Sequence, residues 1–298
     1  MRAMKKELEV TQYIRSLRGD SQSVLVNASD GRIYVAKLID NDQALNLHFN
    51  ESAGTELYRA CGLATPPWKS LLITDDFLNR NRDLWPQGPK GRLRPASGQC
   101  FGSLFMDGGS SRLLEILPGN SFRHIRNQAS FWLAWMVDIC AEQANYRQAI
   151  FVERPERNLK AYFVDHNRLF VGSNERQRLN YQASLYLDSR IYPDTFGEQG
   201  QDLLKFTGTL DVDRLWRKIQ TLPGDWKTTS ALNSFARCLC RLSNLNMLHD
   251  VLDEMVDELQ RIRECALAMA CNDRRPPMGS TVPEVRQRQK SNSATHFN

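Results

Sequence analysis

The strongest constraint on the fold is an ordered series of polar residues near the start of the chain. In chain order these are the turn Arg18-Gly19-Asp20-Ser21-Gln22, the run Tyr34-Val35-Ala36-Lys37 and the pair Asn50-Glu51. A turn of small residues lets backbone N–H groups approach phosphates, a strand lysine contacts the phosphates, and a helix glutamate orients that lysine. The order therefore predicts a phosphate-binding site that contains Gly19, Ser21, Gln22, Lys37 and Glu51.

Each of these residues also has a purely structural interpretation. Gly19 alone is typical of a turn, Lys37 alone of a solvated strand end, and Glu51 of a helix start, where the helix dipole favours an acidic group. Their combination in this order favours phosphate binding over those separate interpretations. We also expect the Lys37 side chain to reach the surface, so that Lys37→Met leaves the fold intact.

Length and charge limit the class of protein. A chain of 298 residues is long enough for two packed lobes that share a cleft, and 41% hydrophobic with 24% charged residues is the ordinary balance of a globular protein. The net charge is +5, but residues 272–298 hold five basic and two acidic side chains, hence +3 of it, which leaves about +2 for the rest. We therefore expect no nucleic-acid groove.

The cysteines and the apolar runs indicate the cellular compartment in which the protein is expected. Seven cysteines occur without CxxC pairs or histidines at zinc-site spacing, which favours free, buried thiols over a metal site. Residues 1–9 are charged, and no run approaches the roughly 18 apolar residues of a membrane span. The sequence thus predicts a cytoplasmic protein with no membrane partner.

Apolar runs and turn residues predict the elements of the first hundred residues. A hairpin is expected from strands at residues 23–27 and 31–38, then a helix over 50–61 that ends at Gly62, then a strand at 70–74. Residues 79–100 hold three prolines and three glycines. This composition favours an exposed connection and marks the expected lobe boundary.

The rest of the chain is expected to be mainly helical. A buried helix over residues 122–142 would place Phe131, Trp132 and Trp135 in the core. A second hairpin is expected from strands at 149–152 and 161–164, and an apolar stripe from Leu248 to Ala266 predicts a long helix. Residues 272–298 lack any periodicity and are predicted to be disordered.

Several motifs resemble those of the HipA-like kinase family, which has a protein-kinase-like fold. The matching motifs are Leu17-Arg-Gly-Asp-Ser-Gln22, Asp30-Gly-Arg-Ile-Tyr-Val-Ala-Lys37, Asn41-Asp-Gln43, Asn50-Glu51, Leu63-Ala-Thr-Pro-Pro67, Phe101-Gly-Ser103, Val164-Asp-His166 and Leu222-Pro-Gly-Asp-Trp226. The resemblance covers roughly residues 10–268 and implies an α+β, two-lobed fold. In such a fold a β-rich N-lobe (10–100) and a mainly helical C-lobe (101–271) enclose a nucleotide cleft. The resemblance also implies ATP and Mg²⁺ as cofactors and a Ser or Thr hydroxyl on a protein as the phosphate acceptor.

The resemblance also implies catalytic positions, and the residues there depart from the family pattern. The family's Asn-x-Asp-x-Arg segment falls on Gln143, Asn145 and Arg147, and its Asp-His-Gly segment places Asp165 as the Mg²⁺ ligand with Asn167 in place of glycine. An amide cannot accept a substrate proton as a carboxylate can. A kinase homologue and a catalytically impaired pseudokinase, which serves as a nucleotide-binding or interaction module, therefore both stay open.

Three residues around these positions also have structural interpretations. Asp165 could begin a turn after its strand, and His166 could be a packed imidazole rather than a group that orders the metal site. Asp138 follows an apolar, aromatic-rich stretch, so its burial would require a partner. We expect that partner to be Arg147, in a structural ion pair.

Overall fold

The computed structural model describes residues 7–17, 23–38, 46–85, 87–88, 91–107, 111–153, 158–170, 181–182, 184–193 and 209–272. The expected phosphate-turn residues Gly19, Ser21 and Gln22 lie outside these ranges, as does the expected tail from residue 273 onward. The chain divides into a compact unit up to Leu259 and a second unit from Gln260. The division into lobes at residue 100 stays a prediction.

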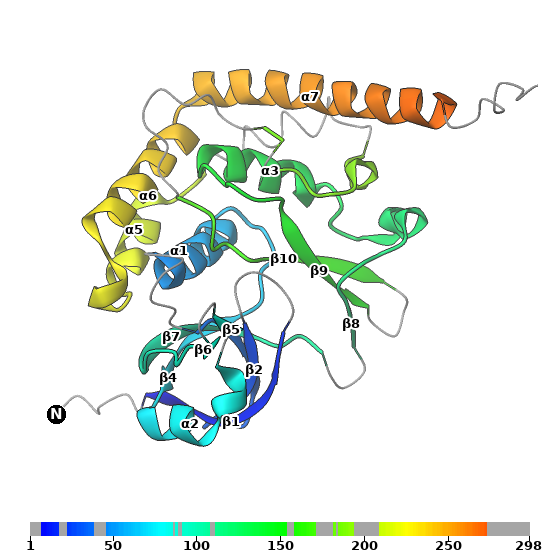
Figure 1. Ribbon diagram of the computed structural model, residues 1–298. Coiled ribbons are helices and arrows are strands. Elements are labelled where there is room, and N and C mark those ends of the chain that lie inside the picture. Colours follow the sequence, from blue (N-terminus) through cyan, green and yellow to red (C-terminus); the bar gives the residue numbers. More distant parts are fainter. Residues whose placement is uncertain are drawn as a thin grey trace, which may run out of the picture. The chain divides into compact units, whose positions relative to one another are not determined.

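Five strands form a closed barrel in the first part of the chain (Figure 1). They are β1 (Leu8–Ser16), β2 (Val24–Ala28), β3 (Ile33–Ala36), β4 (Trp68–Ile73) and β7 (Gly98–Leu104), in the order β1-β2-β3-β7-β4. The parallel pairing of β1 with β4 closes the barrel, and the other pairs are antiparallel. Buried side chains fill the interior, as a small barrel requires, including Val10, Val26, Tyr34, Ala36, Leu71, Ile73 and Cys100.

The expected β2–β3 hairpin and the strand at 70–74 are confirmed, and so is the helix between them. Helix α1 (Leu47–Ala60) begins three residues earlier than expected. It ends as expected at Gly62, whose φ of +70° is a conformation that glycine adopts without strain. The N–H of Leu63 donates to the carbonyl of Tyr58, which completes a Schellman-type end. Most residues of α1 are buried, so the helix packs against the rest of the fold on most of its sides.

Most of the described residues in the segment 79–100 are exposed or half-buried, as expected, but the segment is not a plain connection. It holds the end of α2 (Asp75–Arg80), the 3₁₀ turn η1 (Arg82–Leu84), the short strands β5 (Gln87–Gly88) and β6 (Gly91–Arg92), and the start of β7. Leu84 is 2% exposed and Cys100 is fully buried in the barrel core. The prolines and glycines mark turns correctly, but apolar residues between those turns pack into the barrel.

A second sheet supports the candidate site. Strands β8 (Arg112–Leu114), β9 (Gln148–Glu153) and β10 (Leu159–Val164) pair antiparallel in the order β10-β9-β8, which confirms the second hairpin. Helix α3 (Ser130–Cys140) is shorter than the expected 122–142, because a 3₁₀ turn, η2 (Gly119–His124), and further turns precede it. Asn127 fixes this entry through two hydrogen bonds to the backbone of Ala161, of 3.0 and 2.9 Å.

Helices follow the sheet. They are the short turn η3 (Ser189–Ile191), α5 (Val212–Gln220), the turn η4 (Gly224–Trp226), α6 (Thr229–Leu242) and α7 (Leu245–Asn272). Side chains cap the starts of α5 and α6: Asp211 accepts from the N–H of Arg214, and Thr228 accepts from the N–H of Ala231. The expected apolar stripe of α7 is buried from Leu248 to Leu259. Among the described residues, no helix is long and apolar enough to cross a membrane.

The expected aromatic core and most of the expected free thiols are confirmed. Phe131, Trp132 and Trp135 are each at most 2% exposed, in a cluster of tilted and edge-to-face rings. Cys61, Cys100, Cys140 and Cys238 are buried and free. Cys240 and Cys265 are free but exposed, contrary to the expectation that all the thiols are buried.

Candidate functional site

Lys37 lies between two carboxylates that come from distant parts of the chain. It follows β3, and its N–H donates to the carbonyl of Phe101 on β7 at 2.9 Å. Its Nζ lies 3.0 Å from Glu51 Oε1 on α1 and 2.8 Å from Asp165 Oδ1 after β10. Lys37 is only 7% exposed, so the expectation of a surface-reaching lysine is wrong. The pairing of Lys37 with Glu51 agrees with the order of residues in the sequence.

Burial and mutual contact shift the pKa values of all three groups in this cluster. Burial lowers the pKa of Lys37, but Glu51 and Asp165 outweigh it, so the pKa is raised and Lys37 stays protonated. Burial raises the pKa of Asp165, but Lys37 outweighs it, so that pKa is lowered and the carboxylate is ionised. Burial, together with the charge of Asp165, raises the pKa of Glu51 against the effect of Lys37. Two carboxyl groups thus contact one ammonium, and of the two Asp165 is the one held in its ionised form.

The backbone of Asp165 adopts a conformation that turns its side chain away from the strand direction. Its φ is +61°, in the left-handed region, which aspartate tolerates better than most residues. Such conformations in non-glycine residues cluster at functional sites, because the surrounding structure must hold them. Here the N–H of His166 donates to Glu51 Oε2 at 3.1 Å, and Asn50 Nδ2 donates to the carbonyl of Asn167 at 2.9 Å. Helix α1 therefore holds the turn on both sides.

Gly54 allows this close approach of α1 to the Asp165 turn. A Cβ at Gly54 would lie 2.6 Å from His166 Cβ and 2.6 Å from Leu169 Cδ1. Both distances are shorter than real Cβ contacts, so any larger residue would push the helix and the turn apart. Gly54 was not among the site residues predicted from the sequence. Its position inside a predicted helix could have pointed to it. A glycine there lowers helix stability relative to alanine and usually occurs for a packing reason.

The loop that carries the expected catalytic positions runs beside this turn. The N–H of Ala144 donates to the carbonyl of Arg168 at 3.2 Å, and the N–H of Gln143 donates to the backbone carbonyl of Asp138 at 2.9 Å. Gln143 is 3% exposed, and its Oε1 has no hydrogen-bond partner among the described residues. Asn145 is partly exposed, and its Oδ1 accepts from the N–H of Tyr146 at 2.9 Å. The structure thus brings this loop to the Asp165 turn.

Arg241 holds the start of this loop and was also missed from the sequence. Its guanidinium lies 2.5 Å from Glu142 Oε1, and its Nη1 donates to the carbonyl of Cys140 at 3.1 Å. Glu142 has a φ of +55°, so the ion pair and the carbonyl contact stabilise an uncommon backbone conformation directly before Gln143. Arg241 lies about a hundred residues later on α6, and no local pattern in the sequence points to the contact.

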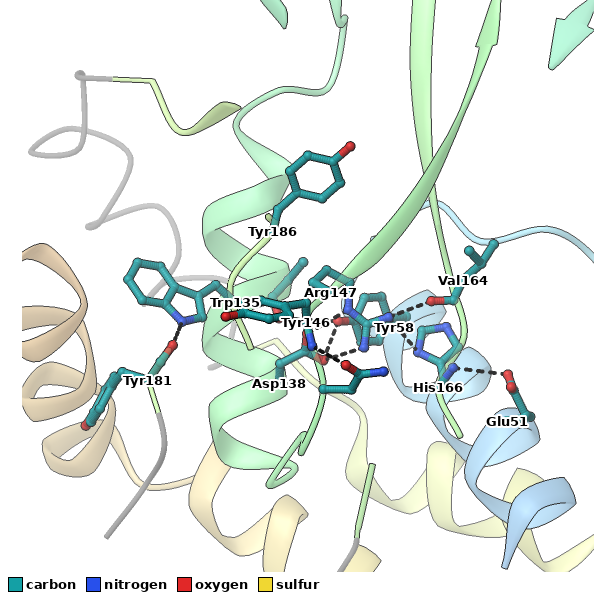
Figure 2. A network of polar contacts seen from close by, with 12 residues as sticks. Glu51, Tyr58, Trp135, Asp138, Tyr146, Arg147, Val164, His166, Tyr181 and Tyr186 are labelled. Atoms are coloured by element: carbon teal, nitrogen blue, oxygen red, sulfur yellow. Dashed lines mark hydrogen bonds and ion pairs between the residues drawn. The ribbon is translucent and has the colours of Figure 1, made fainter. Parts of the chain in front are cut away.

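Arg147 is the centre of a buried network (Figure 2). Its Nε and Nη2 donate to the two oxygens of Asp138 at 2.7 and 3.1 Å, and Tyr58 donates to Asp138 Oδ1 at 2.6 Å. Its Nη1 donates to the carbonyl of Val164 at 2.8 Å. Burial raises the pKa of Asp138, against the effect of Arg147. The expected Asp138–Arg147 ion pair is confirmed, and its geometry suits Arg147 to positioning the loop and β10; a catalytic role for Arg147 stays a prediction.

His166 belongs to the same network as a packed imidazole. Its Nδ1 lies 3.4 Å from Arg147 Nη1, and its ring lies over Tyr58 with centroids 4.5 Å apart. Burial, with Arg147 and Lys37, lowers its pKa well below the usual value, so the ring is neutral. The side chain is 1% exposed and contacts Arg147 rather than open solvent.

The groups around Asp165 fit a hard divalent cation in part. Magnesium is usually held by one or two carboxylates together with the phosphates of its nucleotide. Asp165 offers one ionised carboxylate, and the buried oxygens Gln143 Oε1 and Asn167 Oδ1 have no partner in the described ranges. No group of three or more His, Cys, Asp or Glu side chains within those ranges could hold a metal unaided. The donor set therefore suits a metal that arrives with phosphate ligands.

Comparison with known proteins supports the fold. No family model and no curated protein matches the chain. Among solved structures, the Helicobacter pylori proinflammatory kinase CtkA aligns over 84% of this chain and 100% of its own, with 10% identity and a TM-score of 0.50. The fold is kinase-like and of the α+β class. A Golgi casein kinase with Mn and ADP bound aligns over 83% of this chain and 72% of its own, with 12% identity and a TM-score of 0.43. A second structure of the Golgi casein kinase aligns over 85% of this chain and 75% of its own, with 14% identity and a TM-score of 0.44.

Proposed function

We propose that this chain binds ATP together with Mg²⁺ at the Lys37 cluster, as a kinase homologue distantly related to the HipA-like kinases. The observation that carries the proposal is Lys37 Nζ, which lies between Glu51 and Asp165 at 3.0 and 2.8 Å. A protonated lysine held by a helix glutamate is suited to contact nucleotide phosphates, and an ionised aspartate beside it is suited to hold their metal. In this proposal Gly19, Ser21 and Gln22 cover the phosphates, and the lobes 10–100 and 101–271 enclose the nucleotide.

Each residue of the site would have its own role in binding the nucleotide, the metal or the substrate. Glu51 orients Lys37, and the Arg147 network keeps the 143–147 loop beside β10. Asp165, with the amide oxygen of Gln143 as a further donor, would hold Mg²⁺. When bound, the metal would neutralise phosphate charge. A Ser or Thr hydroxyl of a protein substrate would approach Asn145, which can hydrogen-bond to it but cannot remove its proton.

A second candidate is a pseudokinase that binds nucleotide and serves as an interaction module. Asn145 and Gln143 favour it, because general-base assistance typically supplies about 10²–10⁴-fold in rate. The test is phosphate transfer or ATP hydrolysis by the parent protein and by Asn145→Asp, with Mg²⁺ and then with Mn²⁺. A rate that appears or rises in Asn145→Asp supports an intact site that lacks its base. A fast parent with no gain would show that Asn145 is not at the base position.

Nucleotide binding itself is tested by calorimetric titration of ATP with Mg²⁺ and with a chelator. The proposal predicts saturable binding that weakens when the metal is removed. Replacing Lys37 by Arg keeps the cation between the two carboxylates while changing its shape and reach. Weaker binding with a retained fold is expected for Lys37→Arg, and unchanged binding would contradict the phosphate contact.

A further inference from the structure

A groove outside the Lys37 site lies between helices α1 and α5. It has a volume of about 840 Å³, within the range of known ligand sites. Its lining is Glu56, Arg59, Ala60, Thr209, Asp211, Arg214, Leu215, Arg217, Lys218 and Thr221. Four of these residues are basic and two are acidic, so the lining is positively charged. The α1 residues of the groove follow Glu51 by about one and a half to two and a half helical turns.

The two carboxylates of the groove are already engaged. Glu56 Oε1 accepts from Trp68 Nε1 at 2.7 Å and lies 3.6 Å from Arg59 Nη1. Asp211 accepts from the N–H of Arg214 at 2.8 Å and lies at the positive end of the α5 dipole. Neither carboxylate forms an ion pair with Arg214, Arg217 or Lys218 within the described residues.

The cations on α5 are available to a ligand. Arg214, Arg217 and Lys218 are exposed. Within the described part of the chain, the Arg214 guanidinium and the Lys218 ammonium have no partner, and Arg217 uses only its Nε, toward the carbonyl of Asp213 at 3.3 Å. Spacings of three and four residues put all three on one face of the helix. Arg59, opposite them, is held in place by Thr65 and by the carbonyl of Pro66.

We propose that this groove binds a short acidic peptide segment of a partner protein. Arg214 and Lys218 are separated by about 6 Å along the helix axis, at ~1.5 Å per residue. In an extended peptide, alternate side chains on one face are separated by a similar ~6.6 Å. Acidic groups at alternate positions therefore match the two unpaired cations.

The proposal does not depend on nucleotide binding, and fluorescence anisotropy tests it. The probe is a fluorescein-labelled peptide with glutamate at alternate positions and serine between, at low ionic strength where exposed charges are only partly screened. Two double variants carry the same change in net charge: Arg214→Glu with Lys218→Glu in the groove, and Lys69→Glu with Arg80→Glu, exposed positions outside it. Circular dichroism checks that each variant is folded, and Arg214→Gln with Lys218→Gln replaces the groove variant if it is not.

The groove variant should lose at least about tenfold in affinity, or about 1.4 kcal/mol, while the matched variant stays within about threefold of the parent. A second peptide with phosphoserine in place of glutamate distinguishes the source of the negative charge. Binding of either peptide that depends on the groove supports the proposal. Absence of binding to the parent, or equal losses in both double variants, would overturn it. So would a labelled single-stranded oligonucleotide that binds more tightly than both peptides and depends on the groove.

Discussion

Lys37 Nζ lies 2.8 Å from Asp165 Oδ1, although 128 positions separate the two residues in the sequence. The contact joins the end of β3 to the turn after β10, and α1 takes part through Glu51 at 3.0 Å from the same Nζ. Three separate elements thus bring their charges to one buried point. The predictions below follow from this arrangement and from the network behind it.

Removal of the central cation should destabilise the fold. Lys37→Met would leave two buried carboxylates without their cation, and breaking a buried ion pair costs about 3–5 kcal/mol. The measurement is urea unfolding of Lys37→Met beside Lys69→Met, where the lysine is exposed on β4. We expect Lys69→Met to stay within about 0.5 kcal/mol of the parent. A similarly small loss in Lys37→Met would show that Lys37 is not held as described.

Acid should weaken the protein through buried neutral histidines. Burial, with the charge of Lys37, lowers the pKa of His48 to about 4. Between pH 6.5 and pH 4 the unfolded state binds a proton that the folded state refuses, so stability falls as the pH falls. His48 alone gives a slope of up to about 1.4 kcal/mol per pH unit, and neutral His166 adds to it in the same direction.

This pH dependence is measured by urea unfolding at several pH values. His48→Gln should flatten the slope between pH 6.5 and pH 4, whereas His249→Gln, at an exposed position on α7, should follow the parent. A slope that His48→Gln leaves unchanged would mean that His48 is protonated in the folded state.

Gly54→Ala should separate α1 from the Asp165 turn. Alanine favours a helix by about 1 kcal/mol over glycine, but overpacking against His166 and Leu169 costs about 1–3 kcal/mol. We expect a net loss of stability and weaker ATP binding, measured by urea unfolding and calorimetry. Gly224→Ala is the control, because a Cβ there meets no atom within 4 Å. A more stable Gly54→Ala with unchanged ATP affinity would contradict the close approach.

The Asp138–Arg147 pair should show strong coupling in a double-mutant cycle. Arg147→Met takes the cation away from the buried Asp138 and leaves it the hydrogen bond from Tyr58, at a cost of about 3–5 kcal/mol. Arg147→Met with Asp138→Leu removes both charges and should recover much of that loss. The free energies of unfolding of the two single variants and the double variant measure the coupling. Additive losses would show that the two side chains do not act as a pair.

The sequence predicted the local elements and several of the residues at the site. Both hairpins, helix α1 and its end at Gly62 follow from apolar periodicity and turn residues, and the Lys37–Glu51 pairing follows from their order. The Asp138–Arg147 pair was predictable because a charge in an apolar helix requires a partner.

Other features depend on distant contacts that no local pattern carries. The closure of the barrel by β1 on β4 and the contact of Arg241 with Glu142 belong to this group. The burial of Lys37 was mispredicted because the sequence does not show that Asp165 lies against it. The start of α3 was misplaced because Asn127 bonds to Ala161, 34 residues away, and fixes a non-helical entry.

Thermal unfolding with and without nucleotide tests the central claim most directly. At a hundredfold excess of ATP over its Kd in the presence of Mg²⁺, the parent should gain about 2.7 kcal/mol, a rise in Tm of about 4 °C for a chain of this length. Chelation of the metal should reduce this rise. Asp165→Asn should lose the part that depends on Mg²⁺, while Asp76→Asn, an exposed carboxylate on α2, should keep it. No rise with any nucleotide, with or without metal, would contradict nucleotide binding at the Lys37 cluster.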